Sequence, residues 1–317
     1  MSMATALPVW ALIVVLAALK GTQLGFAGRR FALALGVAAA LFAFELFLAA
    51  PSLQQRARTW LGGRGAVLAP LVPLFAVLIY SAGLTRDWNL MFLGAAYVVV
   101  PALLVATSAG KPPGTWGDYA AAVVIWLPLE FHRMYGIFPY PQPLTHTLTI
   151  LMALSTGVAA YVMLRRLGGV GYAIDWGRDY TFNFGFHFVV FAIIAIPLGM
   201  GMGFLTFGPQ MARVHSLAFD SLAILFFTAW PEEFFFRGLL QNMLSRSFKN
   251  PWWGLITASV IFGFSHIFHA PYPNWKYVVM ATIAGFFYGR AWMKTGSLVP
   301  GTLVHALVDI TWHVLFR

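Results

Sequence analysis

The chain has 317 residues, of which 60% are hydrophobic and only 9% are Asp, Glu, Lys or Arg, and its mean hydropathy is +0.77. Soluble globular domains carry about 25% charged residues, so this composition excludes a soluble globular protein and indicates one that crosses a membrane many times. We attribute the net charge of +10 to Lys and Arg gathered in short loops between membrane helices, and we expect no nucleic-acid partner. The absence of cysteine excludes disulfides, thiolate catalysis, Cys-ligated metals and lipidation of this chain on Cys.

The apolar residues gather in blocks of about the length that a membrane helix needs, roughly 20 residues. The predicted helices lie in residues 5–20, 31–50, 66–84, 90–108, 119–131, 144–164, 182–205, 217–245, 254–270, 278–293 and 298–316. The first block lacks the basic start and the cleavage site of a signal peptide, so we expect it to be retained as a span. The predicted fold class is all-α, a polytopic transmembrane helical bundle of about 10–11 membrane helices.

Glycine, proline and charged residues separate these blocks and predict the loops. The loops lie at residues 28–30, 51–65, 110–114, 138–143, 165–180 and 271–274. Of the ten segments that separate the eleven blocks, the even-numbered ones hold more Lys and Arg than the odd-numbered ones. Basic loops stay on the cytoplasmic side, which predicts a cytoplasmic N-terminus. We therefore expect an integral, multi-pass protein of the plasma (inner) membrane.

Acidic residues inside the apolar blocks are candidates for function, because an ionised carboxylate there costs about 2.5 kcal/mol or more unless it is paired or hydrated. Six of the ten acidic residues lie in such blocks: Glu45, Glu130, Asp220, Glu232, Glu233 and Asp309. The first three have local explanations. Glu45 is expected to make a hydrogen bond inside the bundle or to stay protonated, Glu130 lies beside basic residues at a helix end, and Asp220 lies near a helix start.

The stretch AWPEEFFFRGLL at residues 229–240 gives its two adjacent glutamates different surroundings. Glu233 and Arg237 are four residues apart and share a helix face, so they are expected to form an ion pair, whereas Glu232 points about 100° away around the axis. Pro231 removes a backbone hydrogen bond to Phe227, which predicts a loosened helix at that point. Alternatively, Glu232 joins the same ion-pair network and has only a structural role.

Two further helices carry polar residues at the same predicted depth. If the chain turns at residues 247–250, Glu232 and His266 each lie about 16 residues, or about 24 Å, from the turn. His305 and Asp309 share a face of the last helix, so Asp309 can orient the imidazole. His269 is expected to be an interfacial histidine near the following loop.

The motifs Glu232-Glu-x-x-x-Arg237, Phe262-x-x-x-His266 and His305-x-x-x-Asp309, in this order, resemble those of the CPBP family of CAAX proteases and bacteriocin-processing, abortive-infection-type proteins. The resemblance covers about residues 217–313. It implies an intramembrane endopeptidase, with residues 206–317 as a catalytic helical core and residues 1–205 as membrane helices of unassigned role. This chain has Asp309 where the family often has Asn, and a carboxylate cannot donate an amide hydrogen bond to an oxyanion.

Two hydrolytic schemes fit these residues. In the first, Glu232 activates water with help from His266, His305 donates to the oxyanion while Asp309 or its neighbours set its tautomer, and Glu233 and Arg237 hold the frame. This scheme requires no cofactor and resembles the glutamate mechanism described for the family. In the second, Glu232, His266 and His305 bind Zn²⁺. The substrate in either scheme is a membrane-anchored or membrane-embedded protein, with prenylated CAAX proteins as one class.

Three other kinds of protein remain alternatives. Histidines on facing helices can bind haem, although the glutamates would then have no task. Buried acids and histidines can form the proton relay of a transporter, for which we would expect two repeat-related halves with broken helices. The fold can also serve as a non-proteolytic binding or immunity protein.

Overall fold

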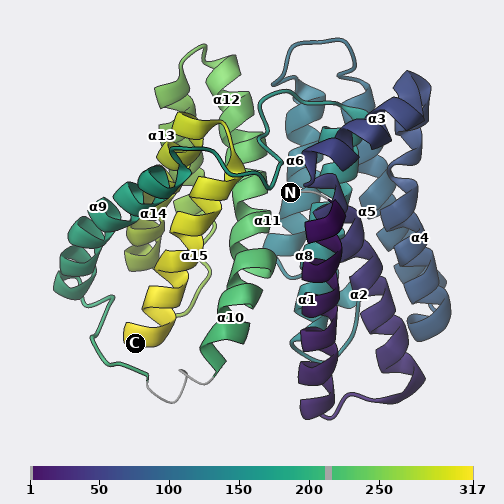
Figure 1. The fold of residues 1–317 in the computed structure, drawn as a ribbon, viewed down its shortest axis with the longest axis horizontal. Coiled ribbons are helices and arrows are strands. Elements are labelled where there is room, and N and C mark those ends of the chain that lie inside the picture. The colour runs from purple at the N-terminus through teal and green to yellow at the C-terminus, as the bar shows by residue number, and fades with distance from the viewer. Residues whose placement is uncertain (1–2, 211–215, 317) are drawn as a thin grey trace. The chain divides into compact units, whose positions relative to one another are not determined.

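A computed structural model describes residues 3–210 and 216–316, with the side chains of residues 63–65 excepted, and it is helical almost throughout (Figure 1). Within those residues the only β-pairing is an isolated bridge between Phe207 and Phe316. The chain divides into two compact units, one of residues Met1–Gly168 with Ala173–Asp175 and one of Gly169–Tyr172 with Trp176–Arg317. The functional division predicted at residues 205 and 206 stays a prediction, since these units reflect packing alone.

The predicted all-α bundle is confirmed, and each of the eleven apolar blocks overlaps a helix or a run of helical segments. The block at residues 254–270 is helical only to Phe264. In the described part of the chain, seven helical stretches are long and apolar enough to cross a membrane by length and composition. They are Met3–Gln23, Gly28–Leu48, Ala66–Thr85, Trp88–Ala106, Leu144–Leu164, Tyr180–Gly201 and Leu298–Leu315. The remaining blocks form shorter, interrupted or less apolar helices. The chain is therefore an integral, multi-pass membrane protein.

The first unit is built around a deeply buried helix. Its helices are α1 (Met3–Gln23), α2 (Gly28–Leu48), α3 (Pro51–Gly65), α4 (Leu71–Tyr80), α5 (Trp88–Ala106), α6 (Trp116–Glu130), α7 (Met134–Ile137) and α8 (Leu144–Gly157). A π-helical turn extends α8 to Leu164, and 83% of this stretch is buried, against 11% for α1. Ser155 on α8 donates a hydrogen bond to Glu45 Oε1 on α2 at 2.7 Å, so the hydrogen-bonding role expected for Glu45 is confirmed.

The predicted loop at residues 51–65 is wrong, because this segment forms α3. Pro51 occupies the start of the helix, where a missing N–H is tolerated, and the polar residues that follow have good helix propensity. The breakers that suggested a loop act only locally: Gly62 has φ 61°, a left-handed conformation that interrupts the helix near its end.

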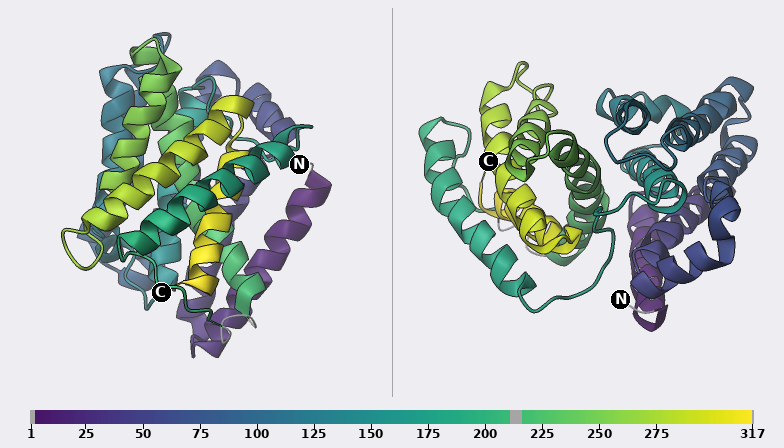
Figure 2. Two further views of the ribbon diagram at one scale, coloured as in Figure 1. Left: turned by 90° about the vertical axis from the view of Figure 1, so that its left-hand side faces the viewer. Right: turned by 90° about the horizontal axis from the view of Figure 1, so that it is seen from above.

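The second unit contains all the motif residues. Its helices are α9 (Tyr180–Gly201), α10 (Leu217–Ile224), α11 (Trp230–Glu233), α12 (Asn242–Ser247), α13 (Pro251–Phe264), α14 (Trp275–Thr295) and α15 (Leu298–Leu315). Helices α10, α11 and α12 are consecutive parts of one long helix, which Figure 1 shows in green. Helix α9 packs against α14 and α15 and runs alongside α14 (Figure 2).

The helix that carries the two glutamates changes its winding on both sides of them. It is π-helical over Leu225–Ala229 and again over Phe234–Gln241. The first of these wide turns precedes Pro231, at the place where the missing N–H predicted a loosened helix. π-Helical turns inside α-helices occur frequently at functional sites.

Glycines let the helices of the second unit approach closely around Glu233 and Arg237. A Cβ atom on Gly285 of α14 would lie 3.0 Å from Phe262 Cδ1 and 3.3 Å from an Arg237 guanidinium nitrogen. A Cβ atom on Gly301 of α15 would lie 3.0 Å from Glu233 Oε2. Small residues at helix contacts permit such close packing in membrane proteins. These contacts fix the rotation of α14 and α15 relative to the motif helix.

Candidate active site

Glu233 and Arg237 form the buried ion pair that their spacing predicted. Arg237 Nη1 lies 2.8 Å from Glu233 Oε1, and the two side chains are 1% and 0% exposed. Arg237 also donates a hydrogen bond through Nη2 to the carbonyl oxygen of Gly285 at 3.1 Å. The ion pair therefore connects the motif helix to α14, and removing either partner would leave an uncompensated buried charge.

Aromatic rings enclose the Arg237 guanidinium. Its Cζ atom lies 4.5 Å from the centroid of the Phe262 ring and 5.2 Å from that of Tyr288. Cation–π contacts of this kind are worth about 2 kcal/mol or more when the cation is desolvated. Phe262 belongs to the second sequence motif, so this contact shows why an aromatic residue stands four positions before His266.

His305 connects the two glutamates. Its Nδ1 lies 3.0 Å from Glu233 Oε1, so the Nδ1–H donates to a carboxylate that Arg237 also holds. Its Nε2 faces Glu232 Oε2 at 3.8 Å and Asp309 Oδ2 at 3.5 Å. The sequence suggested Asp309 or its neighbours as the group that sets the tautomer, and the geometry gives that position to Glu233. Asp309 lies instead on the Nε2 side of the ring.

Glu232 differs from Glu233 in its exposure. Its side chain is 22% exposed, whereas that of Glu233 is fully buried. Glu232 Oε2 approaches His305 Nε2 only to 3.8 Å, beyond ordinary hydrogen-bond distance. One glutamate is therefore engaged in a buried ion pair, while the other is partly exposed beside the imidazole.

His266 lies just after the end of α13 and is oriented by its own backbone. Its Nδ1 donates a hydrogen bond to the carbonyl oxygen of Phe262 at 2.9 Å, which leaves Nε2 as the acceptor nitrogen. The ring packs against Tyr277, with 4.5 Å between centroids, and stacks on His269 at 5.6 Å. An imidazole held in this way can accept a proton or a hydrogen bond only through Nε2.

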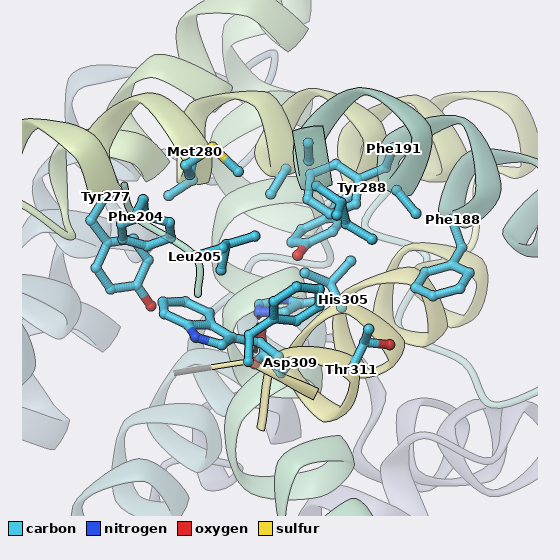
Figure 3. Close-up of a pocket in the computed structure, with 18 of the residues that line it drawn as sticks. Phe188, Phe191, Phe204, Leu205, Tyr277, Met280, Tyr288, His305, Asp309 and Thr311 are labelled. Carbon is cyan, nitrogen blue, oxygen red and sulfur yellow. Dashed lines mark ion pairs between the residues drawn. The ribbon is translucent and has the colours of Figure 1, made fainter. Parts of the chain in front are cut away.

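A pocket brings His266, His305 and Asp309 to one space, as Figure 3 shows for the latter two. The residues that line it come from α9, the 204–205 segment, α13, α14, α15 and Phe316, and include Phe191, Leu205, Phe262, Tyr277, Met280, Tyr288 and Trp312. Its volume is about 80 Å³, and one water needs roughly 10–15 Å³ by the same measure. The pocket can therefore hold several water molecules next to polar side chains, within an otherwise apolar wall.

The six candidate residues thus form one region. The ion pairs described above join Glu232, Glu233, Arg237, His305 and Asp309. The turn after α13 brings His266 to the pocket that His305 and Asp309 also line. The catalytic roles given to them stay predictions.

The other polar residues that the sequence singled out lie elsewhere. Asp220 accepts a hydrogen bond from Ser216 Oγ at 2.6 Å and lies 3.8 Å from His313 Nε2, so the local partner expected for it is confirmed. Glu130 is the last residue of α6 in the first unit. His269 stacks on His266. It also packs on Tyr277, with 5.0 Å between the centroids of these two rings.

The sequence analysis missed two tyrosines of α14 that line the pocket. Tyr288 stacks on His305 with 4.5 Å between ring centroids and 17° between planes, and Tyr277 packs on His266. A signal for both exists, because Tyr277, Ala281, Ala284 and Tyr288 repeat at helical spacing along one face. Small residues between two tyrosines leave space in front of that face.

The proposed zinc ligands are Glu232, His266 and His305. In the described part of the chain, no group of three or more His, Cys, Asp or Glu side chains is placed to hold a metal ion. His305 could offer only Nε2 to a metal, because Nδ1 is bound to Glu233.

Comparison with known proteins agrees with the motifs. Residues 214–311 match the family model described as Rce1-like, type II CAAX prenyl endopeptidase, which confirms the resemblance to CAAX proteases over the last third of the chain. No curated protein and no solved structure matches the chain significantly. The match supports an intramembrane protease with a membrane-associated substrate, and the matched segment contains all six candidate residues.

Proposed function

We propose that this protein is an intramembrane endopeptidase that hydrolyses a peptide bond of a membrane-anchored or membrane-embedded protein with water activated by Glu232. The single observation that carries the proposal is that the two adjacent glutamates differ in burial and in binding partners. Glu233 is buried and holds both Arg237 and His305, whereas Glu232 is partly exposed on the other side of the same imidazole. A carboxylate so placed can accept a proton from water, since Arg237 binds the other glutamate.

In the first step, Glu232 accepts a proton from water as the oxygen attacks the carbonyl carbon of the substrate. His266 assists through Nε2, which its Nδ1 hydrogen bond to Phe262 leaves as an acceptor. The C=O π bond opens and its electron pair moves to the oxygen, so an oxyanion forms. The apolar wall of the pocket limits competing water, which makes electrostatic interactions with this oxyanion stronger than they would be in bulk solvent.

In the second step, His305 stabilises the oxyanion with Nε2–H. This role requires an imidazole protonated on both nitrogens, with Nδ1–H donated to Glu233 and Nε2–H directed into the pocket. Asp309 Oδ2, 3.5 Å from Nε2, compensates the positive charge. The intermediate then collapses as the C–N bond breaks, and the protonated Glu232 gives its proton to the leaving amine. The products are an amine and a carboxylic acid, which loses its remaining proton to solvent on release, and Glu232 returns to its starting state.

The substrate class follows from where the site lies. His305 and Asp309 are in the middle of α15, which is long and apolar enough to span a membrane. A soluble polypeptide would have to enter the bilayer to reach them, whereas a lipid-anchored or membrane-embedded segment is already at that depth. CAAX-type proteins carrying a prenyl group are one such class, in keeping with the family match.

The deciding experiment measures cleavage of a library of membrane peptides, including prenylated CAAX peptides, by mass spectrometry. We expect Glu232→Gln to lower the cleavage rate by about 10²–10⁴-fold, the usual contribution of a general base, with thermal stability in detergent unchanged. Glu130→Gln is the matched control, because it removes another glutamate of an apolar block that lies in the first unit and outside the site. Undiminished cleavage by Glu232→Gln would disprove the assigned role.

Repeating both measurements with a strong chelator separates the two hydrolytic schemes. In the glutamate scheme, chelation leaves the wild-type rate unchanged. Loss of cleavage with chelator, restored by added Zn²⁺, would replace this scheme with the metal-dependent one.

A further inference from the structure

A second pocket in the same unit lies outside the candidate active site. It is formed between the beginning of α9 and the last turns of α14, and its volume is about 540 Å³. Three basic side chains line it: Arg178 just before α9, and Arg290 and Lys294 on α14. Asp179 is the one acidic residue among the lining residues, so the pocket has a net charge of about +2 with His187 neutral.

None of the three basic side chains has an ion-pair partner among residues 3–210 and 216–316. This distinguishes them from Arg165 and Arg237, which are paired with Asp118 and Glu233. Arg290 lies with its Cζ atom 4.5 Å from the centroid of the Trp252 ring, a contact that orients the guanidinium without neutralising it. The unpaired positive charges are therefore available to an anion.

The surroundings of the pocket indicate the kind of molecule that supplies the anion. Phe182 and Phe186 line the pocket and are 75% and 51% exposed, on the first turns of a helix long enough to span a membrane. Trp252 and Trp253, also exposed, begin α13 at the same end of the unit, next to Arg290. Exposed aromatic rings at the ends of membrane helices mark the interface between lipid tails and headgroups. Basic pockets between membrane helices at that level bind phosphate headgroups.

We propose that this pocket binds the phosphate of an anionic membrane lipid, with Arg178, Arg290 and Lys294 contacting the headgroup and Phe182 and Phe186 contacting the acyl chains. Arginine and lysine suit a phosphate because they donate several charge-assisted hydrogen bonds to its oxygens. The bound lipid would lie along α9, whose inward face carries Asn183 and His187 in this pocket and Phe191 and Ala195 in the active-site pocket.

The test titrates detergent-purified full-length protein with phosphatidylglycerol and, separately, with phosphatidylcholine of the same acyl chains, and counts bound lipids by native mass spectrometry. We expect wild type to retain phosphatidylglycerol preferentially. Arg290→Gln and Lys294→Gln should each weaken this binding about five-fold, which corresponds to about 1 kcal/mol per basic side chain near an anionic lipid. Asp179→Asn should strengthen it, a gain that misfolding cannot produce.

Lys249→Gln is the matched control, because Lys249 is an exposed lysine of the loop between α12 and α13 and does not line the pocket. The pocket is supported if Lys249→Gln leaves the affinity unchanged. Equal weakening by Lys249→Gln and Lys294→Gln would show a diffuse surface charge and overturn the proposal. Equal binding of the two lipids would overturn the assignment to an anionic lipid, and so would loss of bound phosphatidylglycerol when inorganic phosphate is added at the same concentration.

Discussion

Each unit contains one fully buried carboxylate paired with an arginine. The two carboxylates differ in the other groups that they bind. In the first unit, Asp118 Oδ1 binds Arg165 Nε at 2.8 Å, and Oδ2 accepts from the backbone N–H groups of Gly114 and Thr115, both at 3.1 Å. Both oxygens are satisfied, and the same aspartate completes a capping box at the start of α6. This carboxylate stabilises a helix end, and both of its oxygens are engaged in hydrogen bonds or the ion pair.

In the second unit, the carboxylate of Glu233 is only partly used by its arginine. Oε1 contacts both Arg237 and His305, while Oε2 is buried without a hydrogen-bond partner within the described residues. The imidazole that Glu233 holds faces a pocket. A buried carboxylate paired with arginine can therefore have either a structural or a functional role. The two roles are distinguished by whether the carboxylate also binds a second titratable side chain, here His305, and by whether that side chain faces a pocket.

Breaking each arginine pair should have the largest effect and should separate the two roles. Removing one partner of a buried ion pair costs about 3–5 kcal/mol, because the other charge is left unpaired. We expect Arg165→Ala and Arg237→Ala each to lower the free energy of unfolding by this amount, measured by denaturation in mixed micelles. Only Arg237→Ala should also lower the cleavage rate of the fraction that stays folded. Equal cleavage per folded molecule in the two variants would contradict this difference.

Adding a methyl group where α14 packs closely against Arg237 should lower the free energy of unfolding by a smaller amount. Gly285→Ala places a methyl group within 3.3 Å of Phe262, Ser259 and Arg237, and such overpacking typically costs about 1–3 kcal/mol. Thermal unfolding in detergent should show the loss.

Gly36→Ala is the matched control for this substitution. Gly36 lies within α2, and an added Cβ there meets nothing within 4 Å. Replacing a helical glycine with alanine at an open position should raise stability by about 0.5–1 kcal/mol. Destabilisation of equal size in both variants would show that the glycine contact around Arg237 is unimportant.

The smallest effect on cleavage is expected from replacing Tyr288, whose ring stacks on His305. Tyr288→Leu removes the stacking contact with His305, worth about 0.5–1.5 kcal/mol, together with the cation–π contact of the same ring with Arg237. It should lower the cleavage rate up to about ten-fold by loosening the imidazole. Tyr288→Phe keeps the ring and should restore most of the rate. A Phe variant as slow as the Leu variant would mean that the hydroxyl, and not the stacking, matters.

Much of the fold could be predicted because it depends on composition and short spacing. The eleven apolar blocks became helices, and Glu233 and Arg237 became an ion pair, since residues four apart meet on any helix. The expectation that residues 51–65 form a loop failed because charged residues and glycine also occur in a polar helix at the end of a bundle. The ion pair between Asp118 and Arg165 was missed because its members lie 47 residues apart.

The sequence by itself determined that this is a multi-pass helical membrane protein with two glutamates, an arginine, two histidines and an aspartate in its last third. Those features follow from hydropathy and helical periodicity, which are local. Only the tertiary structure decided that His305 turns Nδ1 towards Glu233 and Nε2 towards Glu232 and Asp309. The rotation of α15 about its axis is set by contacts such as that of Gly301 with Glu233, which join residues far apart in the chain and leave no periodic trace in it.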